Sequence, residues 1–275
     1  MEEIKYLYHY TSIESLALIL RNKTIRLNPL DKMDDLQEQK TADVENLGKF
    51  VFVSSWTDDP TESIPMWKMY ANPASGIRIK LRANPFLWHE TSGADIERVL
   101  GIPAKDDASR NAVVKTFLNL SKMLDGGYYS PALWKGDILV QTTYTNDISL
   151  LEPQVAKYDG ENITIHTGAL GKHKNLHWSF QKEWRYLMQF MPIDFKAALD
   201  DMPRLITDTT EKLLKGTAPP PFRYFDLDID PQYFEEMEIT CSPQMTFGNR
   251  VILETLVEKY NPSATIRESE LMNLI

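Results

Sequence analysis

Three separated segments of the sequence carry the side chains that could bind or transform a ligand. The first surrounds His9, the second runs from Ser54 to Tyr70, and the third runs from Gln181 to Arg185. A histidine can hydrogen-bond a ribose hydroxyl, act as an acid or a base, or bind a metal ion. The alternative for His9 is a partly buried ring whose nitrogens are satisfied by the backbone.

The second segment places hydroxyl groups beside flat aromatic rings. Ser54 and Ser55 end an apolar run, and Trp67 and Tyr70 follow, three residues apart on one face of a short helix. Such a face can stack a planar ring such as nicotinamide or a base. The same rings could equally belong to the core, where large aromatic side chains often lie.

The third segment alternates polar and aromatic residues. In a strand, alternate side chains point to the same side, so Gln181, Glu183 and Arg185 would share a polar face, with Trp184 and Tyr186 on the other face. This face predicts either the wall of a polar site or a solvated surface with an ion pair.

Other candidate residues have simpler interpretations. His173 and His177 have the spacing of a helical zinc pair but lack a third ligand, so we expect no metal ion. Cys241 lies in an apolar run and is expected in the core. The basic stretch from Lys172 to Arg185 is either a solvated face or the wall of an anion-binding cleft.

Local patterns predict the elements that position these segments. A capping box of Thr11 and Glu14 indicates that a helix follows the first strand, which places His9 at a strand-to-helix junction. Expected strands and further helices follow from apolar spacing, β-branched content and turn residues. The strands are Lys5–Tyr10, Ile25–Leu27, Phe50–Ser55, Gly76–Leu81, Asp137–Tyr144, Glu183–Met191, Tyr224–Leu227, Met237–Cys241 and Thr265–Arg267, and the further helices are Pro65–Tyr70, Asp106–Leu124 and Thr246–Tyr260.

The order of these elements indicates the α+β class, because strands and helices mix without a regular βαβ rhythm. We expect a single domain over residues 1–275. Pro219-Pro220-Pro221 is the strongest break. It either joins a C-terminal lobe, residues 222–275, or forms a rigid loop.

Composition narrows the class of protein. The chain has 275 residues, of which 43% are hydrophobic and 25% charged, as in a globular protein with a sizeable core. The net charge of −9 disfavours broad binding to nucleic acid. A single cysteine, the absence of a signal-peptide pattern and the absence of a long apolar run predict a cytoplasmic protein with no membrane partner.

The motifs taken together resemble a large bacterial domain family of unknown function. The resemblance rests on Leu7–Ser12 (LYHYTS), the MWxxYA motif ending at Ala71, an ExEWR-like segment ending at Arg185 and a C-terminal segment from Ile239 to Leu271. Here Gln181 replaces the first acid of ExEWR. The family description implies no activity.

The order of a His, a strand with aromatics and a strand-borne Glu is also similar to the His-Tyr-Glu plan of ADP-ribosyltransferases. This resemblance implies a split mixed β-sheet core with flanking helices and NAD as co-substrate. It implies that His9 holds a ribose of NAD, that Tyr70 stacks on nicotinamide, and that Glu183 binds the ribose 2′-hydroxyl and stabilises an oxocarbenium-like transition state. Tyr10 stands where that superfamily has glycine.

We therefore predict an NAD-consuming transferase or glycohydrolase without a metal, of the kind used as a toxin or in bacterial anti-phage defence. A protein or a nucleic acid could be its acceptor. The predicted catalytic residue is Glu183, and the predicted NAD-binding residues are His9, Tyr10, Thr11, Ser54, Trp67, Tyr70, Gln181 and Arg185. Two alternatives stay open: a nucleotide-sensing module that uses the same cleft without catalysis, and a protein-interaction domain in which Glu183 pairs with Arg185 or Lys174.

Overall fold

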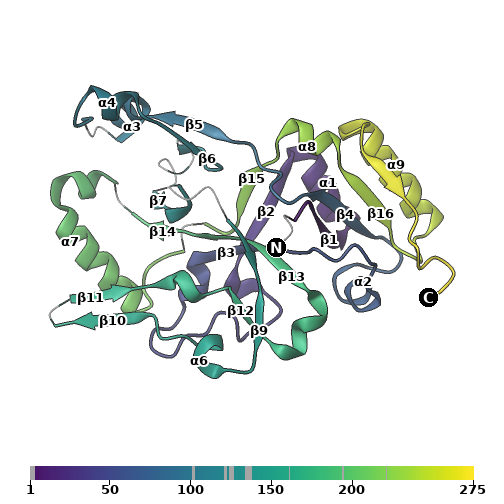
Figure 1. Cartoon of the computed structure of the whole chain (residues 1–275), viewed down its shortest axis with the longest axis horizontal. Helices are drawn as coiled ribbons and strands as arrows, with labels where there is room; N and C mark the ends of the chain where they lie inside the picture. Colours follow the sequence, from purple (N-terminus) through teal and green to yellow (C-terminus); the bar gives the residue numbers. More distant parts are fainter. Residues whose placement is uncertain are drawn as a thin grey trace.

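A nine-stranded mixed sheet is the centre of the computed structural model, which describes residues 4–100, 103–120, 123, 127–133, 138–160, 162–193, 195–220 and 222–275. The strand order is β15-β2-β3-β1-β4-β16-β17, and β13 branches from β3 and carries β8 (Figure 1). These strands are β1 (Tyr6–Ser12), β2 (Thr24–Pro29), β3 (Val51–Thr57), β4 (Gly76–Arg82), β8 (Leu139–Gln141), β13 (Glu183–Gln189), β15 (Phe225–Asp228), β16 (Glu238–Cys241) and β17 (Thr265–Arg267). With helices beside this sheet, the α+β class is confirmed.

Strand β3 is where the sheet divides. Its whole length pairs with β13 on one edge. On the other edge, β2 pairs only with Val53 and Phe52, and β1 pairs only with Thr57. In the described part of the chain, no strand pairs with that edge at the residues between, Ser54 to Trp56. A wedge therefore opens between β1 and β2, with the middle of β3 as its floor.

The first helix closes the back of this wedge. Helix α1 (Ile13–Asn22) follows β1 directly, and the Ser12 hydroxyl caps it by accepting from the Ser15 N–H at 3.3 Å. The predicted cap at Thr11 is wrong by one residue, because the helix begins at Ile13 and the residue directly before it, Ser12, accepts the first-turn N–H. Helix α1 contacts α9 (Phe247–Tyr260), and the two helices lie beside β16 in Figure 1.

The remaining helices are short, apart from one that no sequence pattern indicated. That one is α7 (Phe195–Leu214), which is kinked at Asp201 beside Pro203. The others are α2 (Ile64–Tyr70), α3 (Gly93–Leu100), α4 (Asp107–Asn111), α6 (Ile148–Leu151) and α8 (Pro231–Glu235), with 3₁₀ turns η1 (Leu30–Lys32), η2 (Leu47–Phe50), η3 (Pro131–Leu133), η4 (Thr167–Ala169) and η5 (Leu176–Gln181). Among the described residues, no helix is both long and apolar enough to cross a membrane.

The predicted continuous helix over Asp106–Leu124 is wrong in its middle. In the described part of this span α4 forms at the start, the chain then enters β6 (Val113–Thr116), which pairs with β5 (His89–Ser92), and Leu120 and Met123 are helical again. Val113, Val114 and Thr116 are β-branched, and a strand partner outweighs their weak helical spacing. Residues 121, 122 and 124–126 lie outside the described residues.

The predicted strand Asp137–Tyr144 is two strands with different partners. Strand β8 pairs with β13, whereas β9 (Thr143–Thr145) pairs with β12 (His173–Asn175). Residue 137 lies outside the described residues. Three further pairs complete the strands: β10 (Ala156–Asp159) with β11 (Asn162–Ile165), β14 (Met191–Pro192) with β7 (Tyr128–Tyr129), and β5 with β6.

The chain after the proline run returns to the central sheet. Strand β15 pairs with β2, and β16 pairs with β4 and β17. Met237, Ile239 and Cys241 are fully buried in the same core as Leu7 of β1. Residue 221 lies outside the described residues. The segment proposed as a C-terminal lobe thus supplies strands and core to the sheet that carries the site.

Candidate functional site

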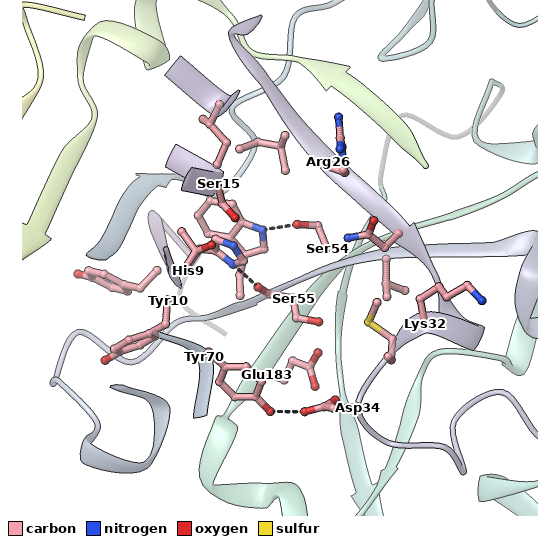
Figure 2. Close-up of a pocket in the computed structure, with 18 of the residues that line it drawn as sticks. His9, Tyr10, Ser15, Arg26, Lys32, Asp34, Ser54, Ser55, Tyr70 and Glu183 are labelled. Atoms are coloured by element: carbon pink, nitrogen blue, oxygen red, sulfur yellow. Dashed lines mark hydrogen bonds between the residues drawn. The ribbon is translucent and has the colours of Figure 1, made fainter. Parts of the chain in front are cut away.

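A cavity of about 440 Å³ occupies the wedge between β1 and β2. Its floor is the unpaired edge of β3, its back is α1, and its far side is formed by α2 and the start of β13 (Figure 2). Seven of the nine predicted site residues line it: His9, Tyr10, Thr11, Ser54, Tyr70, Gln181 and Glu183. Residues up to 174 positions apart in the chain, from His9 to Glu183, thus meet in one space.

His9 is held in its neutral form. Its Nδ1–H donates to the Ser55 carbonyl at 2.8 Å, and the ring packs against Trp56 with centroids 4.9 Å apart. Burial lowers the pKa of His9, and the hydrogen bond to Ser55 opposes this only in part. With Nδ1 as donor, the neutral ring keeps Nε2 as an acceptor. That tautomer suits a hydrogen bond from a ligand hydroxyl.

Tyr70 also lines the cavity and is fixed at its hydroxyl. The Tyr70 O–H donates to Asp34 Oδ2 at 2.6 Å (Figure 2), and Gln181 Nε2 donates to the Tyr70 oxygen. Burial, together with the Asp34 carboxylate, raises the pKa of Tyr70. The ring is therefore a neutral surface held in one orientation, as stacking on a planar ligand requires.

Gln181 offers an unused acceptor inside the site. Its side chain is 4% exposed, and Oε1 accepts no hydrogen bond from the described residues. A buried acceptor without a partner is costly, so it indicates a place for a ligand donor or a water. The predicted strand alternation of Gln181 with Glu183 and Arg185 is wrong, because Gln181 lies outside β13. Gln181 ends η5, and Lys182 then turns the chain in a left-handed conformation before β13 begins at Glu183.

Glu183 sits at the cavity wall within a buried network of charges. Its Oε1 accepts from Arg185 Nε at 2.7 Å, and its Oε2 accepts from Arg185 Nη2 at 2.9 Å and from Lys174 Nζ at 3.3 Å. Lys174 and Arg185 also pair with Glu38, Lys174 at 2.9 Å. All four side chains are at most 3% exposed.

This network keeps Glu183 ionised. Burial favours the neutral acid, but the charges of Arg185 and Lys174 outweigh it and lower the pKa of Glu183. The Tyr144 hydroxyl additionally accepts from the Glu183 N–H at 2.8 Å, which fixes the start of β13. The two carboxylates of the network are balanced by its two cations. The cavity wall therefore carries a carboxylate that stays charged while buried.

Two predicted residues are not in the cavity wall. Arg185 lies behind Glu183, where its Nη1 donates to the Gly171 carbonyl at 3.0 Å. Trp67 is 3% exposed and packs edge-on against Tyr10, and its Nε1–H donates to Glu62 Oε2 at 2.9 Å. Although Trp67 and Tyr70 are three residues apart, the short α2 turns Trp67 into a small core and Tyr70 towards the ligand space.

The basic stretch separates into residues with different roles. Lys174 is buried in the charge network, whereas Lys182 is exposed and pairs with Asp59 at 2.7 Å. His173 lies in β12 and His177 in η5, so they do not form a helical pair. Within the described ranges, no group of three or more potential metal ligands is assembled. Cys241 is fully buried in the core, as predicted.

Two functional residues were missed from the sequence. Glu38 follows a run of acids and amides with no periodic signal, so only its contact with Arg185 and Lys174 reveals it. Arg26 had a usable signal, because Thr24, Arg26 and Asn28 alternate with Ile25 and Leu27. That alternation predicts one polar face on β2, and this face lines the cavity.

Comparison of the chain with protein-family models, with curated proteins and with solved structures gave no match. The function is therefore argued from the geometry of the cavity.

Proposed function

We propose that this cavity binds NAD and that the protein cleaves the bond between nicotinamide and ribose, as an ADP-ribosyltransferase-like or NAD glycohydrolase-like enzyme. The observation that carries the proposal is that His9, Tyr70 and Glu183 line one cavity. A toxin or an anti-phage effector is the biological role that fits an enzyme consuming this cofactor.

The proposed chemistry uses each of these side chains differently. Tyr70 supports the nicotinamide ring, and His9 Nε2 accepts from a ribose hydroxyl. The glycosidic C–N bond breaks, its electron pair leaves with neutral nicotinamide, and the ribose becomes cationic. The Glu183 carboxylate stabilises that cation. Water or an acceptor O–H then adds to the ribose carbon and loses its proton to solvent.

One observation favours a second function, binding of a nucleotide without turnover. Both oxygens of Glu183 are already engaged by cations. A carboxylate neutralised in this way stabilises a ribose cation less than a free one does. A sensor needs only the cavity, the stacking ring and the unused acceptor on Gln181.

Glu183→Gln tests the enzymatic proposal. The substitution keeps the shape and removes the charge, so we expect NAD to bind within a few-fold of wild type. Nicotinamide release should fall by about 10²- to 10³-fold, the effect of removing one electrostatic stabiliser of a transition state. Free nicotinamide is measured during incubation with NAD, and NAD affinity is measured by calorimetry.

Glu38→Gln is the matched control, because it removes an equally buried carboxylate from the same network without changing the cavity lining. We expect both variants to lower the melting temperature, since each leaves two buried cations with one acid. Only Glu183→Gln should show the large fall in nicotinamide release. Equal loss in both variants would contradict the catalytic role. Binding of NAD by wild type without release would favour the sensor, and no rise in melting temperature with NAD would exclude both functions.

A further inference from the structure

A second cavity, of about 410 Å³, adjoins the first on the side of β2. It is lined by Arg26, Asn28, Lys32, Arg223 and Tyr224, and it shares Arg26, Asn28 and Lys32 with the first cavity. The two spaces therefore meet along one polar face of β2. In Figure 2, Arg26 and Lys32 lie on the opposite side of the pocket from His9 and Tyr10.

Arg26 is held in a fixed orientation at this junction. Its guanidinium donates to both oxygens of Asp226, at 2.8 and 3.0 Å, and lies 3.4 Å from the centroid of the Tyr224 ring. Asp226 is the residue opposite Arg26 in the pairing of β15 with β2. The two bonds to Asp226 use two of the five N–H groups of the guanidinium. Arg26 can therefore still donate to an anion.

The charge balance of the second cavity is positive. Three cations, Arg26, Lys32 and Arg223, line it, and none of its lining residues is a carboxylate. The carboxylates Asp34, Glu183 and Asp226 line only the first cavity, and Asp226 is paired with Arg26. Lys32 is 70% exposed, and Asp31 lies 3.6 Å from its Nζ without lining either cavity. In a chain with a net charge of −9, this is a local concentration of positive charge beside a cavity. Arginine forks and lysine ammonium groups are the usual ligands of phosphate oxygens.

We propose that this basic mouth, formed by Arg26, Lys32 and Arg223, binds the diphosphate group of a dinucleotide whose other end enters the first cavity. That the first cavity holds the nicotinamide ring rests on the function proposed above. Recognition of the diphosphate rests only on the three cations of the basic mouth. The dinucleotide then lies in one orientation along the two cavities. The phosphates lie at the cationic β2–β15 side, and the ribose to be cleaved lies at Glu183.

Two variants and two ligands test this assignment. Lys32→Gln and Arg223→Gln each remove one cation and leave the Arg26–Asp226 pair intact. ADP-ribose carries the diphosphate and cannot release nicotinamide, and nicotinamide riboside lacks phosphate. We expect each variant to bind ADP-ribose about five- to tenfold more weakly in calorimetry, as the loss of one charge-assisted bond predicts. Affinity for nicotinamide riboside should not change.

Lys157→Gln is the matched control, because it removes one positive charge from exposed β10, away from both cavity linings. We expect wild-type affinity for both ligands in this variant, and competition between inorganic pyrophosphate and ADP-ribose in wild type. Wild-type affinity for ADP-ribose in both Lys32→Gln and Arg223→Gln would overturn the proposal. Failure of the wild type to bind ADP-ribose would also overturn it.

The result of the ADP-ribose binding test is independent of whether NAD is cleaved. If ADP-ribose binding depends on Lys32 and Arg223 but no nicotinamide is released, the basic mouth stands and the enzymatic function fails. If nicotinamide is released and the KM for NAD is the same in wild type and both variants, the enzymatic function stands and the basic mouth fails.

Discussion

At Glu183 the chain buries a carboxylate together with the cations that keep it ionised. Removing one member of a buried ion network leaves its partners uncompensated, which costs more than the network itself contributes to stability. The main effect of the network is therefore to keep the Glu183 carboxylate in the cavity wall ionised. His9 differs from Glu183, because it is buried without a charged partner and is therefore kept neutral.

The neutral state of His9 predicts a pH dependence of stability. Its folded pKa is lowered below the usual value of 6.5, so as pH falls the unfolded chain binds the proton first. Stability must then decrease as pH falls below about 6.5. We expect the melting temperature of wild type to fall more steeply between pH 7 and pH 5 than that of His9→Asn. Parallel curves for the two proteins would show that His9 titrates as a free histidine.

At the scale of elements, α1 connects the first strand to the cavity. Its residues Ser15, Leu18, Ile19 and Asn22 line the cavity, and its start depends on the hydroxyl of Ser12. A capping hydroxyl satisfies one of the free N–H groups of the first turn. The fit of a ligand therefore depends on a residue that does not line the cavity.

Ser12→Ala should destabilise the protein by about 1 kcal/mol, the usual effect of removing a helix cap. Ser12→Asp should restore most of this stability, because a carboxylate caps equally well. The free energy of unfolding is measured by denaturant titration. Thr11→Val is the control, because the capping-box pattern indicated Thr11 as the cap. A larger loss of stability for Thr11→Val than for Ser12→Ala would contradict the assignment of Ser12 as the cap.

At the scale of the whole molecule, the two ends of the chain build one sheet. Strand β15 lies at its edge beside β2, and β16 lies between β4 and β17. The Arg26–Asp226 pair also crosses from the N-terminal part to this C-terminal part. The walls of the site thus depend on strands from both ends.

A chain ending at Pro220 should therefore lose cooperative folding. It lacks β15, β16 and β17, and it exposes the apolar partners of Ile239 and Cys241, which are fully buried. We expect loss of the near-ultraviolet circular dichroism signal and of a sharp thermal transition. A chain lacking only residues 272–275 should keep both. Cooperative unfolding of the longer truncation would show that the N-terminal part folds alone.

Much of the local structure was predictable from the sequence because it depends on near neighbours. The apolar run of β3, the proline at the start of α2, the span of β4 and the Thr246 side chain that caps the start of α9 each encode their element within a few residues. His9 stood out because it lies between aromatic residues, and Glu183 because it alternates with Gln181 and Arg185 beside Trp184 and Tyr186.

Only the tertiary structure decided which of these residues share a space. Strand β6 formed in place of a helix because β5 supplied a partner, and the site opened because β1 and β2 pair with different parts of β3. Arg185 and Trp67 were turned away from the cavity by Glu38 and Glu62, which the sequence places 147 and 5 residues from them. Pairing between distant strands and charges depends on the partner present in the fold, and local periodicity does not record that partner.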